Sequence, residues 1–171
     1  MEILELIETI SRGEDSRHQF KIDFTNIDAV TAELVAFSNA QGGQLFIGVD
    51  DDGTVKGLTS DAVRRLNQLI SNSASQGVRP PINPQTENIS HPDGLVLMVT
   101  VPEGLKKPYM DKNGIVWVKN GSDKRRATSQ EELLRMFQEA GALCADEMKV
   151  PGSSVSDVDV TAFAAYYEKR I

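Results

Sequence analysis

The amino-acid sequence predicts an α+β domain with a mixed or antiparallel β-sheet. The predicted elements follow in the order helix, strand, helix, hairpin, helix, strand, strand, helix, which differs from the regular alternation of a parallel α/β fold. A chain of 171 residues, 40% of them hydrophobic, can bury about two-thirds of the surface it exposes when unfolded, so it can fold without disulfides or a metal. Its single cysteine, Cys144, excludes an internal disulfide framework and a multi-cysteine zinc site.

The first sixty residues carry apolar side chains at spacings that change from helical to alternating. Residues 1–10 and 26–40 place them on one helix face, so both segments are predicted helices. Residues 17–24 alternate and predict a half-buried strand. After the second helix, the strings QLFIGV and TVKGL flank an Asp-Gly turn at 51–53 and predict a β-hairpin.

The rest of the chain predicts a third helix from Ser60-Asp61, then a long loop over 71–93 with a short strand near 85–89. Strands follow at 95–101 and 115–119. The capping box Thr128–Glu131 opens a helix that stops at Gly141. We therefore expect one domain over residues 1–145. Residues 146–171 form a linker and the start of a helical segment, which we expect to continue in a longer natural protein.

The net charge of −7 is unevenly distributed. Residues 1–60 hold eleven acidic against four basic residues, residues 61–126 hold six against ten, and residues 127–171 hold eight against four. A basic central stretch between acidic ends keeps a nucleic-acid partner open.

No feature of the sequence predicts a membrane protein. The start of the chain is acidic and does not resemble a signal peptide. The longest apolar stretches, 45–49 and 95–99, are far shorter than the roughly 20 residues that cross a bilayer. We expect a soluble, cytoplasmic chain with no membrane partner.

Three groups of residues are candidates for chemistry, and the first is the pair Gly42 and Gly43. Backbone N–H groups around such a turn can converge on a phosphate or another anion. The alternative is a plain helix stop followed by a strand. The sequence contains no GxxxxGK[ST] string, so a P-loop nucleotide site is not supported.

The second group is acidic. Glu14, Asp15 and the run Asp50–Asp52 could meet in space and hold Mg²⁺, a cation that prefers carboxylate and water oxygens. A metal-dependent phosphodiesterase needs such an arrangement to activate water. The alternative is a set of solvated carboxylates in turns.

The third group is basic and surrounds the strand that contains Trp117. Lysine and arginine neutralise phosphates, and the start of the following helix could add a phosphate site. The alternative is an ordinary solvated charge run. We expect Trp117 itself to lie in the core, because its neighbours are apolar. The candidate residues are Lys106, Lys107, Lys119, Lys124, Arg125 and Arg126.

Three ordered strings resemble the Schlafen AlbA domain, a DNA-binding module also catalogued as a divergent AAA domain. They are Glu14-Asp15-Ser16 with Gln19-Phe20-Lys21, then Ala36–Gly57, then Val99–Thr128 followed by Glu131. Together they cover about residues 10–140 of the chain.

The resemblance implies a two-layer α+β sandwich, found N-terminal to a winged-helix region in bacterial transcriptional regulators that are also labelled RecG-like helicases. It therefore implies a DNA-binding function without a cofactor. A first alternative is an RNA endonuclease, because some Schlafen relatives use two glutamates and an aspartate. Glu14 and Asp50 or Asp51 would match, but Gln19 replaces the second glutamate and weakens a Mg²⁺ site. Catalysis is therefore not the favoured interpretation. A second alternative is a nucleotide-sensing, anion-sensing or homo-oligomerising domain.

Overall fold

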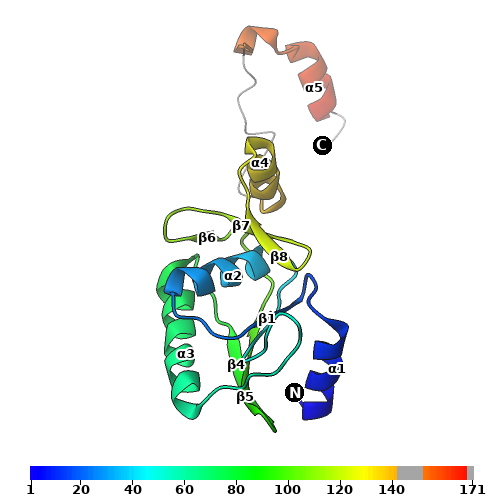
Figure 1. Cartoon of the computed structure of the whole chain (residues 1–171). Helices are drawn as coiled ribbons and strands as arrows, with labels where there is room; N and C mark the ends of the chain where they lie inside the picture. The colour runs from blue at the N-terminus through cyan, green and yellow to red at the C-terminus, as the bar shows by residue number, and fades with distance from the viewer. Residues whose placement is uncertain (142–151, 169–171) are drawn as a thin grey trace.

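A computed structural model describes residues 1–141 and 152–168 of the chain (Figure 1). Its α-helices are α1 (Ile3–Arg12), α2 (Ile27–Asn39), α3 (Ser60–Asn72), α4 (Gln130–Glu139) and α5 (Val160–Glu168). Two short helical segments are η1 (Ser73–Gly77) and η2 (Val155–Asp157). The strands are β1 (His18–Lys21), β2 (Gly43–Ile47), β3 (Val78–Arg79), β4 (Gln85–His91), β5 (Gly94–Val101), β6 (Met110–Asp111), β7 (Trp117–Asn120) and β8 (Asp123–Arg126).

The main sheet has four strands in the order β1-β2-β5-β4. β1 pairs parallel to β2, whereas β2 with β5 and β5 with β4 pair antiparallel. The parallel pair needs a crossover, and α2 supplies it. The sheet is therefore mixed, and the predicted α+β class is confirmed.

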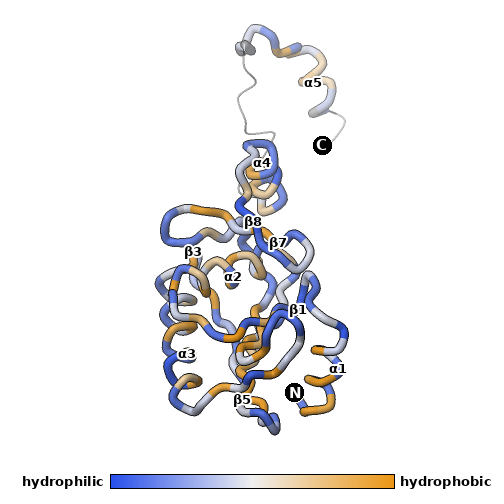
Figure 2. Tube along the Cα trace, viewed as in Figure 1, coloured by the Kyte–Doolittle hydropathy of each residue, from blue (hydrophilic) through white to orange (hydrophobic). Residues whose placement is uncertain are grey.

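Alternating side chains of the central strands bury both faces of this sheet. Leu97 and Val99 of β5 join the larger apolar cluster, which includes side chains of α2 and α3. Val96 and Met98, which point the other way, join a smaller cluster that contains Leu6 of α1. The sheet therefore has helices on both faces, with α2 and α3 on one face and α1 on the other, which adds a third layer to the two that were predicted. Figure 2 shows the apolar colour of β5 in the interior and the hydrophilic colour of β8 outside it.

Helix α2 lies between two structures, the main sheet on one side and the β7–β8 hairpin with β3 and β6 on the other. Its residues 30–38 are all buried, which is why its sequence is apolar around most of its circumference. Asn26 caps its N-terminus by accepting from the N–H of Asp28. The chain leaves the helix through Gly42 with a φ of 71°, which glycine adopts without strain.

Helix α4 starts one residue later than the capping box Thr128–Glu131 predicts, because the N-cap is Ser129, whose hydroxyl accepts from the N–H of Glu132. It ends before Gly141, whose φ is 66°. None of its residues is buried. Among the described helices, none is both long and apolar enough to span a membrane.

Two local predictions were wrong in part. The predicted long loop over 71–93 contains the end of α3, the segment η1 and the strand β3, whereas the short strand predicted near 85–89 is confirmed as the seven-residue β4. The polar string QTENISH of β4 shows no apolar alternation because five of its residues are exposed on an edge strand. The predicted hairpin at 44–58 is reduced to a single bridge between Val49 and Val55 around the turn. The predicted linker lies partly outside the described residues, and the boundary at 145 stays a prediction.

Candidate functional site

The basic candidates gather around the β7–β8 hairpin, which Asn39 ties to the end of α2. The Asn39 amide nitrogen donates to the carbonyl oxygens of Tyr109 at 2.9 Å and Trp117 at 2.8 Å. Its amide oxygen accepts from the N–H of Tyr109 at 2.7 Å. Asn39 therefore holds β7 against the end of α2. The sequence did not single out Asn39, although this residue lies within the string Ala36–Gly57 that resembles the Schlafen AlbA domain.

The buried carboxylate of Asp111 holds the segment that leads into β7. Asp111 accepts from the backbone N–H groups of Asn113 at 2.8 Å and Ile115 at 2.9 Å, and from the Trp117 indole at 3.2 Å. Trp117 is only partly buried and packs against the larger apolar cluster, so it lies at the edge of the core, whereas its apolar neighbours had predicted a position within the core. The hydrogen bonds of Asp111 therefore fix the turn that precedes β7 and the side chain of Trp117, the first residue of β7.

Three of the six basic candidates form ion pairs with carboxylates of the chain itself. Lys124 donates to Glu33 of α2 at 2.6 Å. Lys107 donates to Glu103 at 2.7 Å and also to the carbonyl oxygen of Ala40 at 2.6 Å. The sequence did not indicate that these cations are already engaged.

Arg125 forms the third pair, with Glu132 of α4. The two terminal guanidinium nitrogens, Nη2 and Nη1, lie 2.7 and 3.0 Å from the two carboxylate oxygens. The hydrogen bond from Arg125 lowers the pKa of Glu132 below its ordinary value of 4.5. A bidentate pair of this kind is the geometry in which arginine also holds phosphate.

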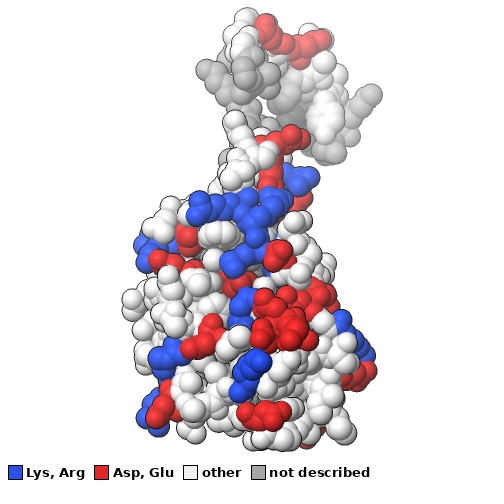
Figure 3. All heavy atoms as spheres, in the orientation of Figure 1, with Lys and Arg blue, Asp and Glu red and all other residues white. Residues whose placement is uncertain are grey.

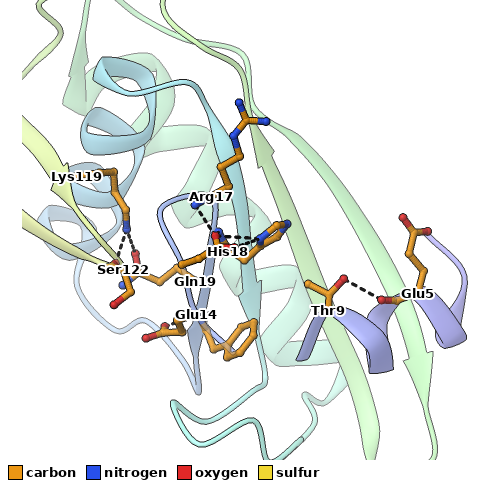
Figure 4. A network of polar contacts seen from close by, with 10 residues as sticks. Glu5, Thr9, Glu14, Arg17, His18, Gln19, Lys119 and Ser122 are labelled. Atoms are coloured by element: carbon orange, nitrogen blue, oxygen red, sulfur yellow. Dashed lines mark hydrogen bonds and ion pairs between the residues drawn. The ribbon is translucent and has the colours of Figure 1, made fainter. Parts of the chain in front are cut away.

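Lys119 is half-buried beneath the hairpin (Figure 4). Its ammonium group donates to the side-chain oxygen of Gln19 at 2.8 Å and to the carbonyl oxygen of Ser122, and it lies 4.7 Å from the centre of the Phe37 ring. Burial lowers the pKa of Lys119 below 10.5, although nearby Glu33 and Glu14 act to raise it. Lys119 is therefore only partly accessible, and its ammonium group is already held by contacts within the domain.

The remaining two cations are accessible. Arg126 is exposed at the end of β8, where its guanidinium lies 5.1 Å from the centre of the Trp117 ring. Lys106 is exposed and makes no ion pair within the described part of the chain. Figure 3 shows basic side chains gathered where β7 and β8 lie in Figure 1, below α4, with acidic side chains around β1. The structure thus groups most of the basic candidates but leaves only some of them unengaged.

The acidic candidates Glu14 and Asp51 approach each other through Lys21. The Lys21 ammonium lies 2.8 Å from Asp51 and 3.9 Å from Glu14. The Glu14 carboxylate also accepts from the N–H of Phe20 at 2.7 Å. Asp50 faces Lys56 at 3.8 Å instead.

These donors do not fit the Mg²⁺ that a Schlafen-type nuclease implies. The Gln19 oxygen is taken by Lys119, and Lys21 lies against both Glu14 and Asp51. Two ammonium groups next to the carboxylates repel a divalent cation. Within residues 1–141 and 152–168, no group of three or more histidine, cysteine, aspartate or glutamate residues could hold a metal ion.

Gly42 and Gly43 are both enclosed by the fold. The Gly42 N–H donates to the carbonyl oxygen of Phe37 at 3.0 Å. A Cβ at Gly42 would lie 2.6 Å from the oxygen of Val101, and one at Gly43 would lie 2.4 Å from the Phe37 ring. This geometry explains both glycines by close packing, and anion binding there stays a prediction.

The described residues form an α+β domain with a mixed sheet and a β7–β8 hairpin rich in lysine and arginine. Comparisons with known proteins identify the family of this domain. Residues 14–128 match the family model described as Schlafen, AlbA_2. The chain belongs to this family. A search of curated proteins finds no match.

Two solved structures share the fold. The crystal structure of the DIP2311 protein from Corynebacterium diphtheriae has a TM-score of 0.53 and 16% identity, and the match covers 97% of this chain and 37% of that one. This chain therefore spans just over a third of the Corynebacterium protein. The solution NMR structure of the N-terminal domain of a RecG-related protein from Nitrosomonas europaea has a TM-score of 0.52 and 24% identity, and covers 76% of this chain and 96% of that one.

Proposed function

We propose that this chain is a nucleic-acid-binding module that contacts DNA phosphates through the β7–β8 hairpin, within a bacterial transcriptional regulator. The observation that carries the proposal is the hairpin itself, whose largely exposed strand β8 carries three consecutive cations. Lysine and arginine on such a ribbon neutralise phosphates and release counterions. The solved neighbour from Nitrosomonas europaea, described as related to an ATP-dependent DNA helicase, supports the same class of partner.

Arg126 is the residue best prepared for this contact. It is exposed, and the Trp117 ring beneath its guanidinium limits the orientations of the side chain. A cation that is already oriented loses less entropy when it binds a phosphate. Lys106 adds a second exposed cation without a carboxylate partner in the described residues.

The net charge of −7 does not oppose this assignment, because binding depends on the local field. Acidic side chains gather around β1, whereas basic ones gather over the hairpin (Figure 3). A duplex that approaches the hairpin therefore meets a positive surface first. The regulator role rests on the family pattern, in which this domain precedes a winged-helix region.

The test is fluorescence anisotropy with a short labelled duplex DNA, with an RNA duplex of the same sequence as a second arm. Arg126→Gln and Lys106→Gln should each weaken DNA binding and reduce the slope of log affinity against log salt by about 1. Arg64→Gln removes the same charge from an exposed position of α3 and is the matched control. If both variants bind like wild type, or if wild type binds neither DNA nor RNA at low salt, the proposal is wrong. Tighter binding of RNA would reassign the partner to RNA.

A further inference from the structure

Helix α4 presents the carboxylate of Glu132 to Arg125 of the β7–β8 hairpin. Both Glu132 oxygens accept from Arg125, and the Glu132 side chain is only 18% exposed although no residue of α4 counts as buried. Residues 130–139 carry three acidic residues against one basic residue. The hairpin cation nearest to α4 is therefore neutralised by α4.

The same helix is only weakly attached to the domain. It shares no extensive contact with any other described helix or strand. A groove of about 400 Å³ separates it from the loop at 103–107, with Met136, Glu139 and Ala140 on the α4 side and Lys107 on the other. Moving α4 away would uncover the partly buried side chains of Leu133, Met136 and Phe137, none of which lies in the core, and would free Arg125.

We infer that α4 is an internal competitor of the nucleic acid, with Glu132 occupying Arg125 until a phosphate displaces it. The inference rests on the proposed function of the hairpin. The Glu132 carboxylate occupies the Nη1 and Nη2 donors of Arg125, so a phosphate that binds this edge of the guanidinium must displace it. Binding of DNA and attachment of α4 to the hairpin are then mutually exclusive at this residue, and each weakens the other.

The test compares Glu132→Gln with Glu131→Gln in DNA-binding assays at low salt. Both substitutions remove one negative charge from the first turn of α4, but Glu131 is exposed and has no partner among the described residues. Glu132→Gln should tighten DNA binding by roughly two- to fivefold, the range that corresponds to release of a surface ion pair. Glu131→Gln should change affinity by less than about 1.5-fold, since it alters only the long-range field.

A second measurement follows the helix directly. Hydrogen exchange of the α4 amides should speed up when duplex DNA is added to wild type, because displaced Glu132 no longer holds the helix against β8. In Glu132→Gln the α4 amides should exchange faster without DNA and change little on its addition.

The possible outcomes separate the two claims. If wild type binds DNA but the two glutamine variants bind equally well, or if DNA slows exchange in α4, the competitor role is wrong and the proposed function stands. If none of the proteins binds nucleic acid, the proposed function fails and the inference fails with it.

Discussion

The buried ion pair between Glu33 and Lys124 offers the sharpest test of how the hairpin is held on α2. Glu33 is fully buried, one of its oxygens accepts from Lys124 at 2.6 Å, and its other oxygen has no hydrogen-bond partner. Lys124→Met keeps most of the side-chain volume but removes the cation. A buried carboxylate that loses its partner costs about 3–5 kcal/mol of stability. Lys119 nearby offsets part of this cost, so we expect a loss of about 3 kcal/mol.

The opposite substitution should cost less, because the two partners differ in their access to water. The Lys124 side chain is 26% exposed and that of Glu33 is 1% exposed. In Glu33→Met the lysine can turn its ammonium group into solvent, so we expect a loss of about 1 kcal/mol. The double variant Glu33→Met with Lys124→Met leaves no buried charge at this position, and its stability should lie within about 1 kcal/mol of wild type.

Urea unfolding of the wild type and the three variants, followed by far-ultraviolet circular dichroism, measures these differences. Lys106→Met is the control, because it removes the same charge from an exposed lysine and should change stability by less than about 0.5 kcal/mol. The reasoning is refuted if Lys124→Met costs less than about 1 kcal/mol, or if Glu33→Met costs more than Lys124→Met.

Three further predictions concern the groups around the hairpin. Asn39→Ala removes three hydrogen bonds that join α2 to Tyr109 and Trp117. It should lower the free energy of unfolding, measured in urea titrations, by about 2–4 kcal/mol. A loss below about 1 kcal/mol would contradict the role of Asn39. Because burial lowers the pKa of Lys119 below 10.5, the unfolded chain binds more protons than the folded one between the two pKa values. The stability of wild type relative to Lys119→Met should therefore rise as the pH increases toward 10.5, and a pH-independent difference in urea titrations would oppose this. Asp111→Ala leaves the N–H groups of Asn113 and Ile115 and the Trp117 indole without an acceptor. It should lower the free energy of unfolding by about 2–3 kcal/mol and shift the fluorescence emission of the single tryptophan. Unchanged emission would argue against the contact between Asp111 and Trp117.

Much of the secondary structure follows from local patterns in the sequence. The apolar spacing of 26–40 predicted α2 within two residues at each end, and the capping box predicted the start of α4 within one residue. The short strand predicted near 85–89 corresponds to β4, but its full length to His91 was not predicted, because an edge strand can expose polar residues on both faces and then shows little alternation. The string SASQG gave no signal for η1, since neither Ser nor Gly favours a helix interior.

The candidate site was predictable only in part. The basic residues between 106 and 126 were identified from charge alone, and most of them do gather around one hairpin. Their partners were not predictable, because Glu33 lies 91 positions from Lys124 along the chain. Asn39 was missed for a related reason, since its contacts with Tyr109 and Trp117 span 70 and 78 positions.

The sequence by itself therefore determined where the helices and central strands form and where positive charge is concentrated. Both depend on neighbours in the chain, through apolar periodicity, capping residues and local composition. Only the tertiary structure decided which cations can receive a phosphate. Whether a lysine or arginine is neutralised depends on carboxylates within about 4 Å in space, and folding brings these from distant parts of the chain. Burial adds to this choice, because it covers part of Lys119 and leaves Arg126 exposed at the surface.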